Sequence, residues 1–297
     1  MAPYSIVVVT WECAEHLRVL VDSINRHLSG DHELIVVDNA SSDDPEEAVG
    51  RREGANRFIA LERNLGFGAA ANAGVEAAAH DGVVLLNPDT VLLDASLDDL
   101  VELGLDRRGL AGPQLLNPDG SAQPSASGPP VGMWPWVGAV LPGGLQPRAL
   151  LARTEPWRLR STAQVAWLTG ACIAAPADTL RALGPFDPAI HLYGEDMDLG
   201  LRADRAGVRS FFCPEVCRIV HHSGASATLR YPDGPADEVA EARRNVLGRL
   251  YGARRERRAG LALRLNLRLR IIVKRALRRD ATRDRLTLQA ARRAASI

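Results

Sequence analysis

The fold of this chain is decided by residues 81–90, which are Asp81-Gly82-Val83-Val84-Leu85-Leu86-Asn87-Pro88-Asp89-Thr90. A short apolar run between turn-forming residues is typical of a buried strand in a parallel sheet. Asp89 then falls at the carboxyl end of the strand, the edge where open α/β sheets bind their ligands. A carboxylate there can hold a divalent cation, and the cation can hold a diphosphate. Asn-Pro and Pro-Asp are also common turn dipeptides, so a plain turn is the alternative.

Strand and helix patterns alternate along residues 1–115. Apolar runs predict strands over 5–10, 33–38, 57–61 and 83–86, and amphipathic stretches predict helices over 14–28, 45–52 and 68–80. This alternation forms right-handed βαβ units. The predicted fold is α/β, with a Rossmann-like, mostly parallel central sheet flanked by helices.

The remaining chain has two different characters. Residues 117–160 are rich in Pro, Gly and Trp, which predicts a long irregular excursion, and loops of that length are usually functional or disordered. Regular patterns return over 164–175, with helices from Asp178 and Glu195 and strands near 208–213 and 217–221. The basic residues 253–297 predict a helical C-terminal extension, although their apolar residues alternate in part as in a strand.

Composition limits the class of protein. No signal peptide is visible at the N-terminus, and no apolar run approaches the roughly 20 residues that span a bilayer. The four cysteines lack zinc-type spacing, which favours reduced thiols in a cytosolic protein. A net charge of zero hides an asymmetry, because residues 253–297 carry 15 Arg or Lys against 3 Asp or Glu.

Two further segments of the first half carry groups suited to a nucleotide. Asp38 ends the second strand, where a carboxylate can accept hydrogen bonds from a base or ribose. A helix cap or Asx-turn is the alternative, and for Asp43 it is the preferred interpretation. Residues 63–74 offer glycines, a helix start and the guanidinium of Arg63, all suited to phosphate. They do not form a G-x-G-x-x-G dinucleotide motif after the first strand.

Taken in order, the motifs of residues 4–226 resemble those of the family 2 glycosyltransferases with a GT-A fold, in the rhamnosyltransferase-like branch. The matching segments are Val8-Val9-Thr10, Val37-Asp38-Asn39, Arg63-Asn64-Leu65-Gly66-Phe67, Asn87-Pro88-Asp89, Leu168-Thr169-Gly170-Ala171, Gly194-Glu195-Asp196-Met197-Asp198-Leu199 and His221-His222-Ser223-Gly224-Ala225-Ser226. The resemblance implies a GT-A domain over 1–226, with a nucleotide-sugar half (1–115) and an acceptor half (116–226), followed by the basic helical extension 227–297.

The resemblance also assigns the donor side. It implies that the nucleotide sugar is bound by Thr10, Glu12, Asp38, Arg63, Asn64, Gly68, Asn72 and Asn87. Asp89 matches the metal-binding aspartate of the family's D-x-D motif, whose first position is Asn here. With one carboxylate fewer, Mg²⁺ or Mn²⁺ needs a further ligand, and His221 is the candidate. Strand alternation lets only one of His221 and His222 point into the cleft, and a one-residue slip would select His222.

On the acceptor side, the resemblance implies that Asp196 is the catalytic base, with Glu195 beside it. Carboxylates at a helix start also interact favourably with the helix dipole, and Asp198 with Arg202 forms an ordinary i,i+4 pair. The sugars are expected near Trp167, Thr169 and Gly170, with a core tryptophan as the alternative.

The expected function is a metal-dependent inverting glycosyltransferase that moves L-rhamnose from dTDP-rhamnose to a saccharide or polyprenyl-linked glycolipid in bacterial envelope polysaccharide assembly. Other dTDP-, UDP- or GDP-sugars, a catalytically silent nucleotide-sugar-binding scaffold, and a nucleotidyltransferase are the alternatives. The last expects a glycine-rich basic loop after the first strand, which 10–13 lacks. The extension 253–297 predicts either contact with an anionic membrane, which would place the enzyme at the inner face of the plasma membrane, or a helical cover or homo-oligomer contact. Nucleic acid is the least favoured partner.

Overall fold

The computed structural model describes residues 3–29, 32–50, 56–141, 143–190, 192–223 and 234–296. The main sheet contains β1 (Tyr4–Thr10), β2 (Glu33–Asp38), β3 (Asn56–Ala60), β4 (Gly82–Leu86), β6 (Leu110–Gly112), β9 (Ala163–Val165), β11 (Cys172–Pro176) and β12 (Ser210–Phe212). Two smaller sheets contain β5 (Thr90–Leu92), β7 (Gln114–Leu116) and β13 (Arg218–His221), and β8 (Ala126–Ser127) with β10 (Trp167–Leu168). The helices are α1 (Ala14–His27), α2 (Pro45–Val49), α3 (Phe67–Ala77), α4 (Ser96–Arg107), α5 (Trp134–Val140), α6 (Arg148–Thr154), α7 (Ala177–Leu183), α8 (Glu195–Arg205), α10 (Ala236–Tyr251), α11 (Ala253–Ala276) and α12 (Thr282–Ser296), with 3-10 turns η1 (Gly143–Leu145) and η2 (Pro156–Arg158).

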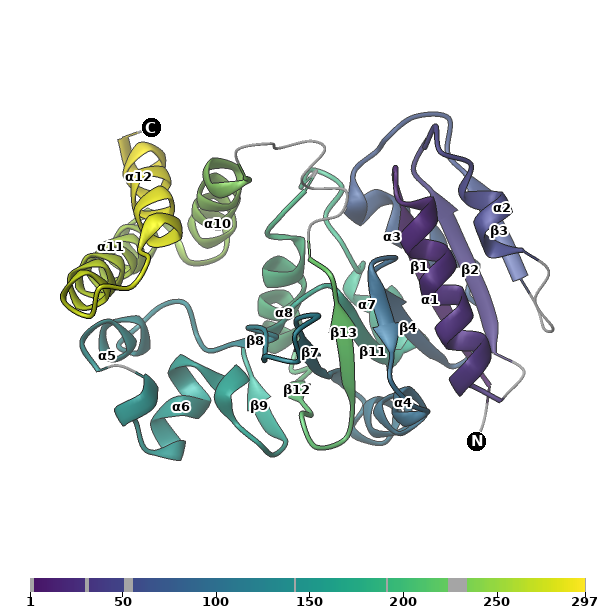
Figure 1. The fold of residues 1–297 in the computed structure, drawn as a ribbon, viewed down its shortest axis with the longest axis horizontal. Coiled ribbons are helices and arrows are strands. Elements are labelled where there is room, and N and C mark those ends of the chain that lie inside the picture. Colours follow the sequence, from purple (N-terminus) through teal and green to yellow (C-terminus); the bar gives the residue numbers. More distant parts are fainter. Residues whose placement is uncertain are drawn as a thin grey trace.

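The predicted α/β fold with a mostly parallel sheet is confirmed (Figure 1). Among the described residues the main sheet has eight strands in the order β3-β2-β1-β4-β11-β6-β12-β9. β11 runs antiparallel to both of its neighbours, and β9 runs antiparallel to β12. β5, β13 and β7 form a separate sheet, so the chain changes sheets between β4 and β5.

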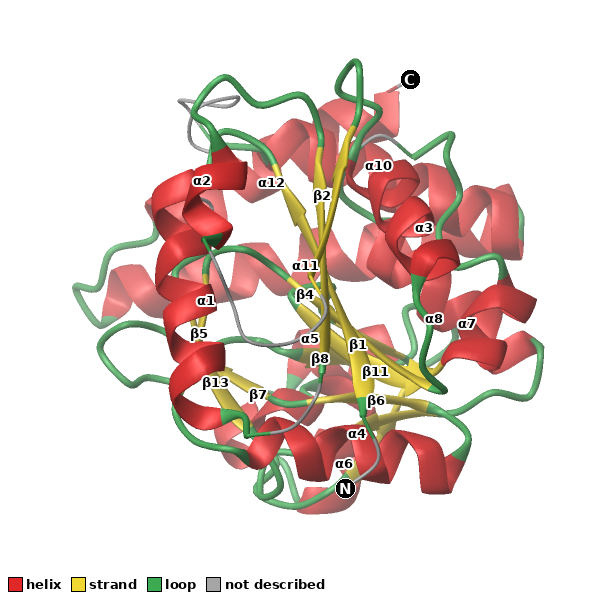
Figure 2. Ribbon diagram, turned by 90° about the vertical axis from the view of Figure 1, so that its right-hand side faces the viewer, coloured by secondary structure: helices red, strands yellow, loops and turns green. Residues whose placement is uncertain are grey.

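Helices cover both faces of the main sheet (Figure 2). Alternate residues of β1 point to opposite faces: Ile6 and Val8 pack in the cluster that contains α1, whereas Val7 and Val9 pack in the cluster that contains α3. Both faces of this strand are therefore buried, which explains its unbroken apolar sequence. On the α3 face Gly74 is needed, because a Cβ there would lie 2.3 Å from Cγ1 of Val7.

Specific residues determine where α1 begins and where α2 ends. The backbone N–H of Ala14, the first residue of α1, donates to Oδ2 of Asp43 at 2.7 Å. Asp43 thus satisfies an N–H at the start of α1 and does not cap the helix that begins at Pro45, whose N-cap is Asp44. Helix α2 ends at Val49, before the predicted 52, because Gly50 adopts a φ of +61° and breaks the helix. Residues 51–55 lie outside the described residues.

The excursion 117–160 is more regular than expected. It contains α5, α6 and the two 3-10 turns, so the prediction of an irregular segment is wrong for much of its length. Pro135 lies in the first turn of α5, where the missing backbone N–H costs nothing, and therefore starts the helix rather than breaking it.

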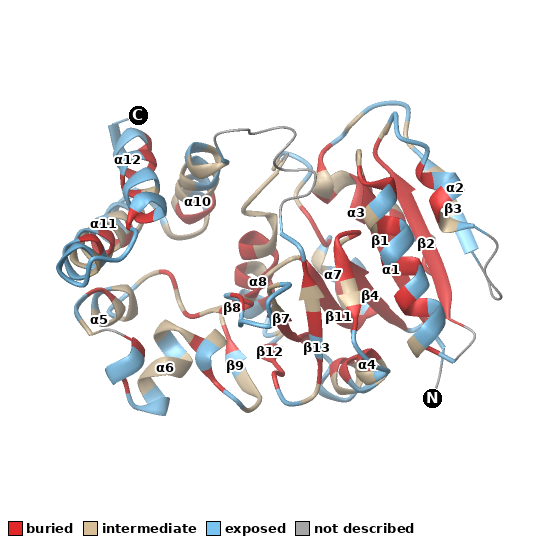
Figure 3. Cartoon of the chain, in the orientation of Figure 1, coloured by how far each residue is buried: buried red, intermediate tan, exposed pale blue. Residues whose placement is uncertain are grey.

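The basic extension is helical, as predicted. α10 and α11 pack on α8 through a cluster formed by Met197, Leu201, Val246, Leu247 and Ala259. Figure 3 shows the central strands buried and much of α11 and α12 exposed. No helix within the described ranges is long and apolar enough to span a bilayer. The predicted domain boundary at 226/227, together with Gly224-Ala225-Ser226, falls outside those ranges.

Candidate active site

The turn after β4 carries Asp89 from the main sheet to the small one. The N–H of Asn87 donates to the carbonyl of Ala171 on the neighbouring strand at 2.9 Å. The carbonyl of Asn87 accepts from the N–H and the hydroxyl of Thr90, at 3.3 and 2.7 Å. The segment is thus a tight turn, and it leaves the Asp89 side chain only 8% exposed.

β13 brings a histidine to this turn. His221 pairs with Thr90 in the antiparallel β5–β13 ladder, and the N–H of His222 donates to the carbonyl of Asp89 at 2.9 Å. Nε2 of His221 lies 3.3 Å from Oδ1 of Asp89. The ring of exposed His222 meets that of His16 edge-on, with centroids 5.8 Å apart. The structure therefore places His221, not His222, against Asp89.

The acidic start of α8 lies close to the same turn. Oδ2 of Asp196 accepts from the N–H of Gly170 at 3.2 Å, and Oδ1 accepts from that of Met197 at 2.6 Å. Gly170 directly precedes Ala171, whose carbonyl holds Asn87. One short segment thus fastens both Asp196 and the Asn87-Pro88-Asp89 turn.

Glu195 and Asp196 form a half-buried acidic pair. Burial raises the pKa of Asp196, against the opposing effect of the two backbone N–H donors. Burial, followed by the charge of Asp196, raises the pKa of Glu195 to about 8. Oε2 of Glu195 is buried and lacks a hydrogen-bond partner among the described residues. Glu195 is therefore mainly protonated at neutral pH.

Asp198 has a different role from its acidic neighbours. Its side chain is fully buried and receives Nε of Arg202 and Nη2 of Arg249, each at 2.7 Å. The predicted pair with Arg202 is present. Arg249 belongs to α10 and also pairs with Asp187, so this carboxylate fastens the C-terminal helices to α8.

Carboxylates also gather at the ends of β1 and β2. Oδ1 of Asp38 accepts from the N–H of Ser41 at 3.0 Å, three residues on, which is the spacing of a cap and not of an Asx-turn. Glu12, at a φ of +50°, accepts from the N–H and hydroxyl of Ser42 at 2.9 and 3.0 Å. The hydroxyl of Thr10 is buried and unpartnered within the described part of the chain. All three lie at the predicted ligand edge of the sheet.

Comparison with known proteins identifies the family. Residues 5–122 match the profile described as Glycosyl transferase family 2, and residues 150–279 match that of Glycosyl transferase family group 2. Over 248 residues the chain is 31% identical to the N-acetylglucosaminyl-diphospho-decaprenol L-rhamnosyltransferase of Mycobacterium tuberculosis, covering 76% of this chain and 78% of that protein. The chain belongs to glycosyltransferase family 2. It is a glycosyltransferase, and the predicted rhamnosyltransferase-like resemblance is confirmed.

Solved structures agree with the GT-A fold of this glycosyltransferase. The mannosyltransferase PcManGT from Pyrobaculum calidifontis, solved with GDP-Man and Mn²⁺, superposes with a TM-score of 0.59 at 17% identity, over 100% of this chain and 87% of that one. Residues 1–349 of S. aureus TarS, solved with UDP-GlcNAc, give 0.56 at 15% identity, over 97% and 79%. At these identities the likeness concerns the fold alone.

In this glycosyltransferase several predicted donor-side residues make structural contacts. The side-chain amide of Asn72 forms two hydrogen bonds with the backbone of Phe186. Its Nδ2 donates to the carbonyl at 2.8 Å, and its Oδ1 accepts from the N–H at 3.0 Å. A Cβ at Gly68 would lie 2.9 Å from Cβ of the same Phe186. Oδ1 of Asn64 accepts a hydrogen bond from Nδ2 of Asn39 at 3.1 Å, which orders the loop. The neighbouring Arg63 is exposed. Contacts with Phe186 therefore account for the glycine at position 68 and the asparagine at position 72, and no phosphate is needed to explain either residue.

The acceptor-side residues of the glycosyltransferase also pack. Half-buried Trp167 packs against the α8–α10 cluster, as in its core alternative, and a Cβ at Gly200 would lie 2.3 Å from its Cβ. Thr169 donates its N–H to Ser125 at 3.0 Å and its hydroxyl to Pro124 at 3.1 Å. Among Trp167, Thr169 and Gly170, only Gly170 forms a hydrogen bond with Asp196 in the described part of the chain.

Sequence reasoning missed Gln123. Its Oε1 lies 3.0 Å from Nδ1 of His221, and its Nε2 donates to the carbonyl of His221 at 2.6 Å. Gln123 follows the turn 117–120, and no spacing rule connects it with β13 almost a hundred residues later. Only the pairing of β13 with β7 brings the two segments together.

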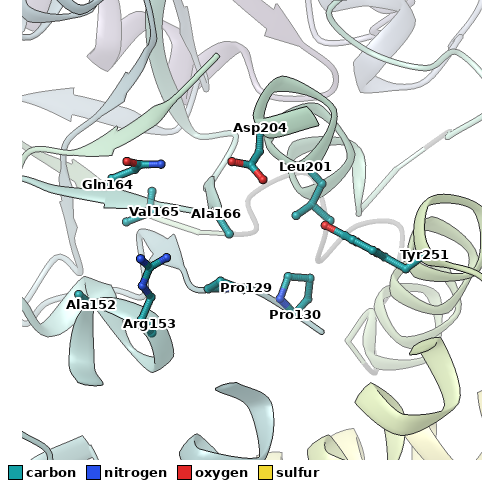
Figure 4. Close-up of a pocket in the computed structure, with 10 residues that line it drawn as sticks. All are labelled: Pro129, Pro130, Ala152, Arg153, Gln164, Val165, Ala166, Leu201, Asp204 and Tyr251. Atoms are coloured by element: carbon teal, nitrogen blue, oxygen red, sulfur yellow. The ribbon is translucent and has the colours of Figure 1, made fainter. Parts of the chain in front are cut away.

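A small cavity of about 80 Å³ lies elsewhere in the glycosyltransferase (Figure 4). Pro129, Pro130, Arg153, Asp204 and Tyr251 are among its lining residues. The residues that line it include none of the predicted site residues. It is therefore separate from the candidate active site.

Proposed function

We propose that this glycosyltransferase transfers L-rhamnose from dTDP-rhamnose, with inversion, onto a saccharide hydroxyl of a polyprenyl-linked glycolipid in bacterial envelope polysaccharide assembly. The observation that carries the proposal is the fastening of Asp196 and the Asn87-Pro88-Asp89 turn to adjacent residues, Gly170 and Ala171. This shared fastening supports the assignment of a donor-side motif and an acceptor-side acid to one site. The rhamnosyltransferase activity and lipid-linked acceptor named for the mycobacterial relative support the choice of substrates.

A divalent ion fits between Asp89 and His221. A carboxylate oxygen and an imidazole nitrogen face each other at 3.3 Å, and both side chains are almost fully buried. Mn²⁺ accepts both kinds of ligand, whereas Mg²⁺ prefers oxygen, so the pair favours Mn²⁺. The described residues contain no cluster of three or more His, Cys, Asp or Glu side chains, so donor phosphates and water would complete the coordination. When bound, the ion would supply Lewis-acid neutralisation of the departing nucleoside diphosphate.

Asp196 would take the proton of the attacking hydroxyl. The two backbone N–H donors fix its carboxylate, and its raised pKa makes it a better proton acceptor than an exposed aspartate. Protonated Glu195 carries no charge that would compete for the proton. The attack of the acceptor oxygen on the anomeric carbon breaks the bond to the diphosphate and inverts that carbon.

The nucleoside would be bound at the edge formed by Thr10, Glu12 and Asp38. The unpartnered hydroxyl of Thr10 and the carboxylate of Asp38 offer polar atoms to a base or ribose. Exposed Arg63, with Asn64 and Asn87, remains the candidate set for the diphosphate.

A thermal-shift panel tests the donor. The protein is heated with Mn²⁺ and dTDP-rhamnose, dTDP-glucose, UDP-glucose, UDP-GlcNAc or GDP-mannose, and the melting temperatures are compared. Stabilisation chiefly by dTDP-rhamnose is expected, and equal shifts with UDP- or GDP-sugars would overturn the rhamnose assignment. Binding of dTDP-rhamnose without transfer to a GlcNAc-diphospholipid or hydrolysis would instead indicate a silent binding protein.

The surface of α5 and α11 would contact the membrane that carries the acceptor. Large apolar side chains are exposed on both helices, at Met133, Trp136, Val140, Leu261, Ile272 and Val273. Asn266 of α11 donates to the carbonyl of Gly138 in α5 at 2.8 Å, so the two helices lie together. Exposed arginines of α11, including Arg257 and Arg268, flank these side chains. An apolar surface rimmed by arginine suits an anionic bilayer.

A further inference from the structure

The amide of Gln123 can adopt only one orientation. Its Nε2 lies 2.6 Å from the carbonyl of His221 and 2.9 Å from Oδ1 of Asn117, and a carbonyl oxygen can only accept hydrogen bonds. The NH₂ group must therefore point to that side. Its Oε1 consequently points to His221, 3.0 Å from Nδ1, and accepts a further hydrogen bond from the hydroxyl of Ser223 at 3.2 Å.

This orientation favours one position for the proton of the imidazole. Because Oε1 of Gln123 only accepts, its 3.0 Å contact with Nδ1 of His221 favours a hydrogen on Nδ1, and the hydroxyl of Ser223, 3.2 Å from both atoms, then donates to Oε1. A neutral imidazole has one ring hydrogen, so Nε2 presents a lone pair to Oδ1 of Asp89 at 3.3 Å. Two electron-rich atoms at this distance repel each other, and a metal cation or a proton between them relieves that repulsion.

We propose that Gln123 is a positioning residue that holds His221 as the Nδ1–H tautomer and aims its Nε2 lone pair at Asp89. The inference rests on the metal site of the proposed function. Without Gln123, the hydrogen could move to Nε2 and be donated to Asp89. That bond would satisfy both side chains and would have to break before a metal ion could bind.

Gln114 supplies a matched control. It is buried to the same degree as Gln123, 6% against 7% exposed. Its Nε2 donates to the carbonyl of Gln123 and to the hydroxyl of Ser125, each at 2.9 Å. Within the described part of the chain, the side chain of Gln114 makes hydrogen bonds to Leu115, Gln123 and Ser125 and none to His221. Gln114→Met thus disturbs the same polar network without touching the imidazole, whereas Gln123→Met removes the nearer acceptor of Nδ1–H and leaves only the hydroxyl of Ser223, at 3.2 Å, among the hydrogen-bond partners of Nδ1 in the described residues.

The tautomer is measured in the metal-free protein by ¹⁵N NMR of labelled histidine side chains, with His221→Gln for assignment. Wild type and Gln114→Met should show Nδ1–H at His221, and Gln123→Met should show Nε2–H or a mixture. Gln123→Glu, whose carboxylate still accepts from Nδ1–H, should retain the wild-type tautomer. An unchanged Nδ1–H tautomer in Gln123→Met would overturn the inference, and Gln123→Glu decides the question if the methionine variant does not fold.

Mn²⁺ titration followed by electron paramagnetic resonance gives the second measurement. Gln123→Met should bind Mn²⁺ about 10–100-fold more weakly than wild type, since loss of an outer hydrogen-bond partner has effects of that size. Gln114→Met should bind close to wild type, and equal losses in both variants would contradict a specific role for Gln123. If Asp89→Ala leaves the affinity unchanged, the metal site of the proposed function fails, whereas the tautomer experiment still decides the role of Gln123.

Discussion

At the scale of single residues, Asp196 carries the proposed chemistry. Asp196→Asn keeps the shape of the side chain but cannot take a proton, and its single amide oxygen can accept only one of the two hydrogen bonds from Gly170 and Met197. Since a positioned base contributes about 10²–10⁴-fold, kcat should fall by that factor while the Kd for the donor stays nearly constant. Steady-state transfer assays and calorimetry separate the two quantities. Transfer by the variant at the wild-type rate would exclude Asp196 as the base.

Glu195 should make stability depend on pH. Its carboxyl has a pKa of about 8 in the folded protein against 4.5 for a free glutamate side chain, so the folded state binds more protons between these limits. Its contribution to stability is therefore complete below pH 4.5 and is lost as the pH rises through 8. Glu195→Gln should remove this loss, which amounts to at most ~1.4 kcal/mol per pH unit. Urea unfolding of both proteins at pH 6 and pH 9 measures the difference, and parallel losses would contradict the assignment.

At the scale of elements, α8 is shaped by its contact with β10. A methyl group at Gly200 would lie 2.3 Å from Cβ and 2.7 Å from Cα of Trp167, and backbone cannot move away cheaply. Gly200→Ala should therefore lower the free energy of unfolding by about 1–3 kcal/mol. Gly248→Ala in α10 is the control, because a Cβ there meets nothing within 4 Å. Because alanine favours helix more than glycine does, Gly248→Ala should raise the free energy of unfolding by up to ~1 kcal/mol. Denaturant unfolding of the two variants measures the expected loss and the expected gain.

The elements differ in how far sequence could predict them. β1, β2 and β4 were predictable because strands buried on both faces must be apolar throughout. Asp89 and Asp196 could be found because each stands beside a local signal, a strand end or a helix start. Gln123 could not, because its partner is reached only through the β7–β13 pairing. Likewise Asn72 has the residue type of a phosphate contact, and only the fold shows its amide engaged by Phe186.

At the scale of the whole molecule, the charge is divided between its two ends. The segment 253–297 has 15 Arg or Lys and 3 Asp or Glu, so the rest of this neutral chain is acidic. The basic end also exposes the apolar side chains of α5 and α11, whereas β1 and β2, whose ends form the proposed nucleotide site, lie at the other end (Figure 1). This arrangement would let the acceptor side meet a lipid surface while the donor side faces water.

Vesicle sedimentation tests this arrangement. Ile272→Glu, at a side chain 62% exposed, should reduce binding to phosphatidylglycerol vesicles, because the carboxylate opposes both apolar insertion and the anionic headgroups. Val19→Glu is the matched control, since Val19 is 47% exposed on α1, away from the extension. Wild-type protein should bind phosphatidylcholine vesicles much less. If Ile272→Glu instead dissociates a dimer in ultracentrifugation and leaves vesicle binding unchanged, the surface is an oligomer contact.

The ladder between β5 and β13 has a consequence for how such enzymes diversify. Backbone hydrogen bonds hold His221 against the turn of Asp89, and they make no demand on the side chains in between. The segment from α5 to α6 can therefore change in length and sequence without disturbing that register. A chimaera that receives this segment from a relative should accept a different sugar acceptor and keep its own donor. The pairing of β5 with β13 would thus stay constant in such relatives while the segment between the two strands, and with it the choice of acceptor, changes.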